Sequence, residues 1–179
     1  MTTNDIADII IKDLCRRSFP VFLTTFQGVG MDEADVLGIN RNGYMYEFEI
    51  KRSRSDFRAE FKNKEHKHEK LRNRNAVKVY DEWKNGKRTG KKYECIIIPN
   101  RYYFVCPIGL IKLDEVPNHA GLIYADKSLY ESMSEVKRAP FLHRSKANQQ
   151  IYARAATILS QRIIYGCSYY THQQKTMEK

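Results

Sequence analysis

Asp35, Glu49 and Lys51 have the residue types and the spacing that metal-assisted cleavage of a phosphodiester requires. Such a hydrolysis needs a divalent cation held by oxygen ligands, positive charge beside the scissile phosphate, and an oriented water. Glu49 and Lys51 are two residues apart, so in a strand both side chains lie on one face, about 6.6–7 Å apart. We therefore expect the two carboxylates to hold the metal while the ammonium reaches the attacking water or the phosphate.

The acid-x-Lys pattern alone is a weak signal, because it occurs five times in this chain. The occurrence at Glu49 and Lys51 differs from the other four, because a tight turn and an upstream acid precede it and a basic segment follows it. An exposed strand face with an ordinary salt bridge would contain the same residues. The residues by themselves leave both interpretations open.

Apolar periodicity predicts the first elements that carry these residues. Residues 4–17 have apolar side chains three and four positions apart, behind Asn4 or Thr3 as the N-cap, which indicates an amphipathic helix. The segments 19–26 and 35–39 are short and rich in β-branched, aliphatic or aromatic residues, which is typical of strands.

A hairpin is predicted next. Residues 40–43, Asn-Arg-Asn-Gly, are typical of the tight turns that close hairpins, and residues 44–51 then alternate between charged and apolar side chains. This arrangement places the two carboxylates on paired strands. A helix capped by Ser53 or Ser55 should follow and lie on the sheet with its basic face in water.

The second half of the chain predicts the remainder of a sheet. Residues 72–98 are largely polar, and we interpret them as an inserted hairpin or a mobile loop. We expect further strands at 102–106 and 121–125 and an edge strand at 134–137. A helix should follow from 146 to about 165. This order predicts a single α/β domain over residues 1–179, with a central mixed β-sheet flanked by helices.

The charge distribution favours an anionic partner. The chain has 179 residues and a net charge of +10, but residues 1–50 hold 4 basic and 8 acidic residues whereas residues 51–74 hold 10 basic and 4 acidic ones. A basic block of this kind suits a phosphate backbone or an anionic membrane surface. A solvated helix face is the ordinary alternative.

Other features narrow the class of protein. The longest apolar runs are far shorter than the ~20 residues that span a bilayer, and the first residues do not resemble a secretion signal. We therefore expect no membrane partner and a cytoplasmic location. The four cysteines, Cys15, Cys95, Cys106 and Cys167, form no C-x-x-C pair, and we interpret them as ordinary buried thiols.

Two stretches resemble the PD-(D/E)XK nuclease superfamily. They are Asp35-Val-Leu-Gly-Ile39 and, after the turn, Tyr46-Glu-Phe-Glu-Ile-Lys51 with its continuation to Phe57. The chain is similar in particular to small single-domain bacterial and phage members of the type of MmcB DNA-repair proteins. Residues 99–107 and 121–126 also look like that group, so the resemblance covers most of 1–145 apart from 72–98.

This resemblance implies a restriction-endonuclease-like core and a Mg²⁺-dependent deoxyribonuclease, with Mn²⁺ as a substitute metal. Asp35, Glu49 and the backbone carbonyl of Ile50 would be the metal ligands, and Lys51 the catalytic lysine. DNA would be the substrate, in repair, recombination or processing, within a bacterial or phage-infected cell.

Two further acids are candidates for the metal site. Many members of the superfamily add an acid from the first helix, and we favour Asp8 over Asp5 and Asp13, although all three could instead serve the helix terminus or its solvated face. Glu47 shares the face of the central glutamate. It could help to bind a second metal or cap the sheet edge.

Basic side chains near the predicted site are candidate phosphate contacts. They are Arg52, Arg54, Arg58, Lys62, Lys64 and Lys67, together with His143, Arg144 and Lys146 at the entry to the last helix. His66 and His68 are poorly spaced on a helix for joint metal binding, and we expect both on the solvated surface.

The sequence supports three hypotheses. The first is a metal-dependent DNA nuclease, and the second is a catalytically inactive nuclease-fold protein that only binds DNA as an accessory factor. The third is an RNA-binding module whose exposed aromatics, such as Tyr102, Tyr103 and the pair Tyr169-Tyr170, stack on bases. A homodimer through the apolar C-terminal helix is compatible with each of them.

Overall fold

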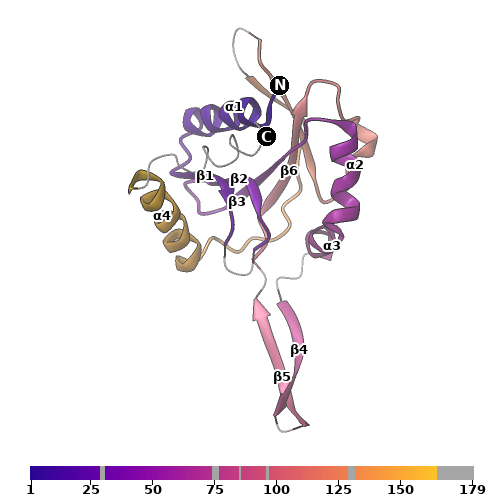
Figure 1. Cartoon of the computed structure of the whole chain (residues 1–179), viewed down its shortest axis with the longest axis vertical. Helices are drawn as coiled ribbons and strands as arrows, with labels where there is room; N and C mark the ends of the chain where they lie inside the picture. The colour runs from indigo at the N-terminus through magenta and orange to yellow at the C-terminus, as the bar shows by residue number, and fades with distance from the viewer. Residues whose placement is uncertain (29–30, 74–76, 85, 96, 129–131, 165–179) are drawn as a thin grey trace, which may run out of the picture.

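The chain folds into alternating helices and strands, as seen in a computed structural model that describes residues 1–28, 31–73, 77–84, 86–95, 97–128 and 132–164 (Figure 1). The elements, in order, are α1 (Thr3–Arg16), β1 (Val21–Phe26), β2 (Ala34–Ile39), β3 (Met45–Ile50), α2 (Arg54–Asn63), α3 (Glu65–Asn73), β4 (Val77–Lys84), β5 (Lys87–Cys95), β6 (Arg101–Pro107), the 3₁₀ turn η1 (Leu113–Glu115), β7 (Gly121–Asp126), β8 (Ser132–Lys137) and α4 (Gln149–Ile164).

Six strands form one mixed sheet in the order β1-β2-β3-β6-β7-β8. The β1–β2–β3 meander is antiparallel, β3, β6 and β7 are parallel, and β8 is an antiparallel edge. The central strand β6 is buried along almost its whole length, as expected where helices cover both faces of a parallel pair. The predicted α/β class, a mixed sheet flanked by helices, is confirmed.

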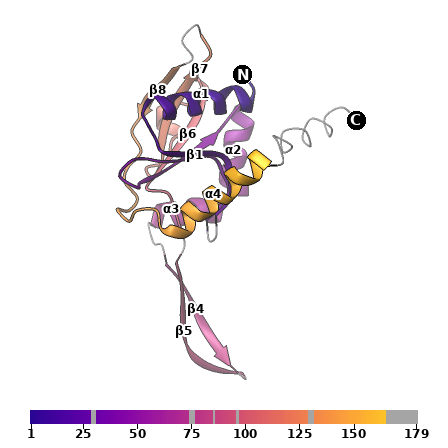
Figure 2. The same cartoon turned by 90° about the vertical axis from the view of Figure 1, so that its left-hand side faces the viewer.

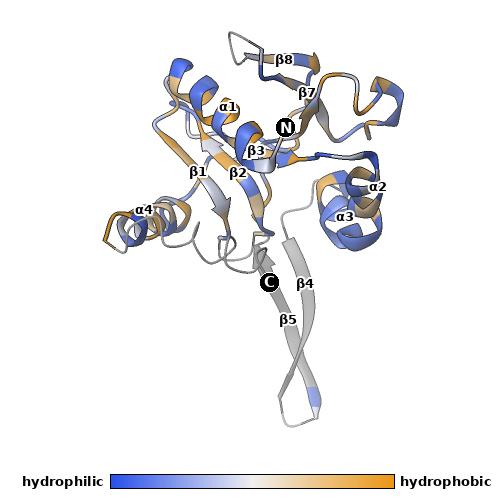
Figure 3. Cartoon of the chain, turned by 45° about the horizontal axis from the view of Figure 1, so that its top comes forward, coloured by the Kyte–Doolittle hydropathy of each residue, from blue (hydrophilic) through white to orange (hydrophobic). Residues whose placement is uncertain are grey.

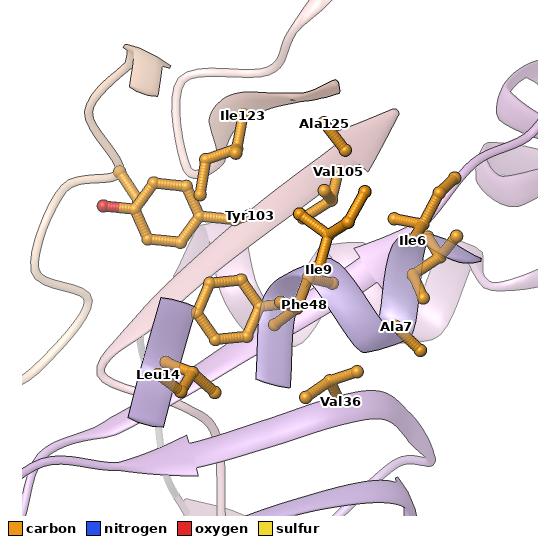
Figure 4. Packing of buried hydrophobic residues seen from close by; sticks show 13 residues of the cluster. Ile6, Ala7, Ile9, Leu14, Val36, Phe48, Tyr103, Val105, Ile123 and Ala125 are labelled. Carbon is orange, nitrogen blue, oxygen red and sulfur yellow. The ribbon is translucent and has the colours of Figure 1, made fainter. Parts of the chain in front are cut away.

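Helix α1 covers one face of the sheet. Three of its isoleucines, Ile6, Ile9 and Ile10, pack with Leu14 against the β2, β3 and β6 side chains Val36, Phe48 and Val105, and all of these are nearly inaccessible to water (Figure 4). The helix begins earlier than predicted, because Thr2 is the N-cap: its hydroxyl accepts from the Asp5 amide while the Asp5 carboxylate accepts from the Thr2 amide.

The opposite face carries three helices. Phe57 of α2 and Leu71 of α3 pack against Phe104 of β6, and Ile151 of α4 packs over Leu37 of β2. Figure 2 shows α2, α3 and α4 below α1 in the view. Ser53 is confirmed as the N-cap of α2, but the single helix predicted after it is wrong. The helical hydrogen bonding stops at Lys64 and resumes with α3, so two short helices follow one another on this face (Figure 1).

The segment predicted as an inserted hairpin or mobile loop contains β4 and β5, which pair with each other only, as a two-stranded antiparallel sheet. Figure 1 shows this hairpin extending away from the six-stranded sheet. The last helix begins at Gln149, three residues later than predicted, because the Asn148 side chain accepts from the Ile151 amide and caps it there.

The thiols differ from the prediction at one position. Cys106 is buried in β6, but Cys15 is exposed because it lies on the outer side of α1. Cys167 and the side chain of Cys95 lie outside the described residues. Among the helices that the structure describes, none combines the length and apolarity needed to cross a membrane.

Candidate active site

The β2–β3 hairpin brings Asp35 to Glu49. Val36 pairs with Phe48 across the two strands, so the same register sets Asp35 opposite Glu49. The turn holds this register: the Asn40 side-chain oxygen accepts from two turn amides, and Gly43 has a φ of +81°, which disfavours any residue with a Cβ. The Asp35 carboxylate also accepts a hydrogen bond of 2.7 Å from the Ile50 amide.

Two carboxylates in this position oppose each other's ionisation. Burial, together with the charge of Glu49, raises the pKa of Asp35 to about 6, although the Ile50 amide and nearby lysines favour the ionised form. A desolvated carboxyl with a pKa near neutrality beside a second carboxylate is typical of functional sites, where a cation can relieve the repulsion.

Glu49 is the centre of the charge cluster. Its Oε1 lies 3.1 Å from Lys51 Nζ and 2.5 Å from Lys64 Nζ, and its Oε2 lies 2.9 Å from Lys67 Nζ. Burial opposes ionisation of Glu49, but these three ammonium groups, of which Lys67 acts most strongly, hold its pKa below the usual value. Glu49 is therefore a buried carboxylate with lysine partners on both of its oxygens.

Lys51 is held by two glutamates. Its ammonium lies 2.7 Å from Glu60 of α2 as well as 3.1 Å from Glu49, and only 4% of the side chain is exposed. Burial opposes the charge of this lysine, but the two carboxylates together raise its pKa. The Lys51 amide donates to Val105 of β6, which fixes the backbone just after β3.

Sequence reasoning missed Glu60. It also accepts a hydrogen bond from the Tyr102 hydroxyl, and its neighbours hold its pKa well below the usual range despite burial. One signal was present: Glu60 lies three residues after Phe57, on the apolar stripe of α2, where a charged residue needs a buried partner.

Lys67 and Glu47 form a second buried pair. The distance from Lys67 Nζ to Glu47 Oε1 is 2.6 Å, and 3% and 1% of these two side chains are exposed. Burial raises the pKa of Glu47 to about 7, although Lys67 counteracts it. Lys67 was predicted as a phosphate contact. That prediction is wrong, because α3 turns this residue into the cluster rather than toward solvent.

The two histidines of α3 divide between surface and core. His66 is exposed and lies 3.0 Å from Asp32, as the surface prediction implies. His68 is buried, so the surface prediction is wrong for it: its Nδ1 lies 3.0 Å from His119 and its Nε2 lies 3.3 Å from Glu60. Because α3 is a separate helix, the face that it buries differs from that of one continuous helix.

The buried His119 predicts a pH dependence of stability. Burial, with the nearby charges of His68, Arg72 and Lys137, lowers its pKa from 6.5 to about 4. The unfolded chain therefore binds this proton more readily, and folding should lose about 3 kcal/mol from this group as the pH falls from 7 to 4. Urea denaturation at several pH values should give a flatter pH profile for His119→Gln than for wild type. Parallel profiles would contradict this expectation.

Some of the predicted phosphate contacts line the outside of this site. Arg54, Arg58 and Lys62 follow one another at four-residue intervals along α2. Figure 3 shows hydrophilic residues along much of α2 and α3. Arg58, Lys62 and the nearby Arg52 are exposed, whereas Arg54 is bound by Glu115 and by the Leu110 carbonyl. Lys64, which was also predicted to contact phosphate, forms an ion pair with Glu49.

Arg144, Lys146 and His143 lie at the other end of β3. The amide of Ala147, the residue after Lys146, donates to the Gly43 carbonyl in the β2–β3 turn, and the backbone around His143 accepts hydrogen bonds from Asn100, just before β6. The side chains of Arg144 and Lys146 are exposed. The structure therefore separates them from the α2 group by the length of the strand.

The aspartates of α1 do not join the cluster through any contact among the described residues. Asp8 is exposed, Asp5 pairs with Lys127, and Asp13 pairs with Arg17. Helix α1 also packs on the face of the sheet opposite to that of Glu49. Helix α1 therefore packs against the sheet and brings no carboxylate into contact with the charge cluster among the described residues.

The donor chemistry fits a hard cation. Asp35, Glu49 and the Ile50 carbonyl offer only oxygen, which Mg²⁺ and Mn²⁺ prefer. Within the described part of the chain, no three His, Cys, Asp or Glu side chains are already arranged as a metal site. A metal at Glu49 would have to compete with Lys64, the more exposed of its lysines, for Oε1.

The two tyrosines of β6 that were predicted to stack on RNA bases are buried in the core and cannot reach a nucleic acid. Tyr102 is fully buried and Tyr103 is 5% exposed, because both belong to the central strand β6. The prediction that they stack on RNA bases is therefore wrong. Tyr169 and Tyr170 lie outside the described residues.

Comparisons with known proteins give a fold and no activity. No family model matches the chain, and no curated protein is significantly similar to it. A solved structure, the SPO1766 protein of unknown function from Silicibacter pomeroyi, superposes with a TM-score of 0.58 over 88% of this chain and 86% of that one. The two sequences are 19% identical, so this similarity shows the fold alone.

Proposed function

We propose that the protein is a metal-dependent DNA nuclease with a restriction-endonuclease-like core. The observation that carries the proposal is the Asp35 carboxylate, which faces Glu49 and accepts from the Ile50 amide at 2.7 Å. We infer that these two carboxylates and the Ile50 carbonyl would share one metal ion, with Lys51, which lies 3.1 Å from Glu49, beside them. Such a set suits phosphodiester hydrolysis better than any other chemistry that these residue types could perform.

Each residue has a defined task in this proposal. Asp35, Glu49 and the Ile50 carbonyl would hold Mg²⁺, and the chemistry that the ion would supply when bound is polarisation of the phosphate and a lower pKa for a coordinated water. Lys51 donates to the phosphate or to the attacking water, and Glu60 is a positioning residue that holds the Lys51 ammonium at 2.7 Å. The exposed Arg52, with the basic stripe of α2, holds the DNA backbone.

A cleavage assay tests the proposal. Labelled linear, circular, branched and single-stranded DNA would be incubated with Mg²⁺, Mn²⁺ or EDTA, using wild type and Glu49→Gln. Asp32→Asn is a matched control, since Asp32 pairs with surface residues of α3 outside the cluster. We expect wild type and the control to cut only with metal and Glu49→Gln to lose cleavage. Equal cleavage by Glu49→Gln would overturn the assignment.

A specific observation favours a second candidate, a nuclease-fold protein that binds DNA without cutting it. Both oxygens of Glu49 already contact lysines, so this carboxylate has cationic partners without a metal. Buried ion pairs can be purely structural. In that case wild type should bind DNA with a strong salt dependence and cut none of the four DNA forms.

A further inference from the structure

We propose that the Lys67 ammonium is a built-in second cation, so that the acidic cluster takes one divalent metal rather than two. This inference rests on the proposed metal site of Asp35 and Glu49. It concerns the other side of Glu49, where Lys67 enters from α3.

Lys67 is surrounded as a metal ion would be. Its Nζ lies 2.6 Å from Glu47 Oε1, 2.9 Å from Glu49 Oε2 and 3.1 Å from the Glu33 carbonyl oxygen. Two carboxylates from alternate positions of β3 and one backbone carbonyl form an oxygen set that a divalent cation could also use. The ammonium, only 3% of whose side chain is exposed, already fills that position.

The two oxygens of Glu49 are held differently. Lys64, on the Oε1 side, is 37% exposed and lies at the break between α2 and α3, so it can leave for solvent. Lys67, on the Oε2 side, belongs to a helix that is anchored by the buried Leu71 and by the contact of His68 with His119. Moving Lys67 would therefore require moving α3.

The environment of Glu47 also indicates that Lys67 takes the place of a second metal ion. This carboxylate is 1% exposed, and Lys67 is its one ion-pair partner among the described residues. Glu47 and Glu49 lie on the same face of one strand, so without the lysine two buried carboxylates would repel each other. A divalent metal would then be the simplest replacement for the lost charge.

A Mn²⁺ titration measures the number of divalent ions that each chain binds, and it does not depend on cleavage. Mn²⁺ would be titrated into wild type, Lys67→Ala, Lys64→Ala and the double variant Lys67→Ala/Glu47→Gln, following free Mn²⁺ by electron paramagnetic resonance. We expect one Mn²⁺ per chain for wild type, two for Lys67→Ala, and one for the double variant. Lys64→Ala, which removes the most exposed lysine beside Glu49, should keep one ion and bind it more tightly.

The stoichiometries separate the two proposals. Two ions in wild type, or no additional ion in Lys67→Ala, would overturn the role of Lys67. No ion in wild type but one in Lys67→Ala, lost again in the double variant, would support that role and contradict the metal site at Asp35. Thermal unfolding with and without Mn²⁺ shows whether Lys67→Ala is folded, and the double variant gives a folded reference because it removes both charges.

Discussion

Asp35→Asn should stabilise the metal-free protein and at the same time abolish cleavage. Asp35 has a pKa raised from 3.8 to about 6 by burial and by Glu49, so its ionised form is unfavourable in the folded state. Asparagine keeps an oxygen that can accept from the Ile50 amide but carries no charge. We expect a gain of about 2 kcal/mol in the free energy of unfolding near pH 7. Loss of a metal ligand should reduce cleavage at least ~10²-fold.

The gain has a definite pH dependence. Above pH 6 the wild-type carboxylate is charged and the destabilisation is fully present, whereas it fades as the pH falls toward 3.8, the value for the unfolded chain. Urea denaturation of both proteins in EDTA at pH 7.5 and pH 4 measures it. A variant that is less stable than wild type at pH 7.5 would show that this carboxylate is a structural group.

Lys51→Ala should remove cleavage and also destabilise the fold by about 3 kcal/mol, because two buried glutamates each lose one of their cationic partners. If Lys51 lay on an exposed strand face, as the interpretation of these residues as an ordinary salt bridge expects, its removal would leave folding largely intact. The burial of Lys51 between Glu49 and Glu60 contradicts that expectation. Lys51→Ala therefore cannot by itself separate chemistry from folding.

Lys51→Arg makes that separation. The guanidinium keeps the positive charge between Glu49 and Glu60, so the unfolding midpoint in urea should stay close to that of wild type. Its geometry differs from that of an ammonium, and we expect cleavage to fall at least ~10²-fold. A folded Lys51→Arg protein that cuts DNA at the wild-type rate would contradict the role of Lys51.

The hairpin part of the site could be predicted from local sequence. A glycine turn at 40–43 sets the register, and strict alternation along β3 places Glu49 and Lys51 on one face. These are short-range effects of backbone geometry, which the residue order encodes directly. The α/β class was predictable for the same reason, from the periods of the apolar residues.

Local sequence could not predict which other charges meet Glu49. Glu60, Lys64 and Lys67 come from the helices after β3, and a charge run on a helix gives no sign of which residues face the sheet. The break at Lys64 changes the buried face of α3, and with it the positions of Lys67 and His68.

The sequence by itself therefore determined the strand pair that carries Asp35, Glu49 and Lys51, because hairpin register and side-chain alternation are local. Only the tertiary structure decided that three lysines surround Glu49. Packing α2 and α3 on the sheet excludes water from these carboxylates, and each buried charge must then find a partner within the protein.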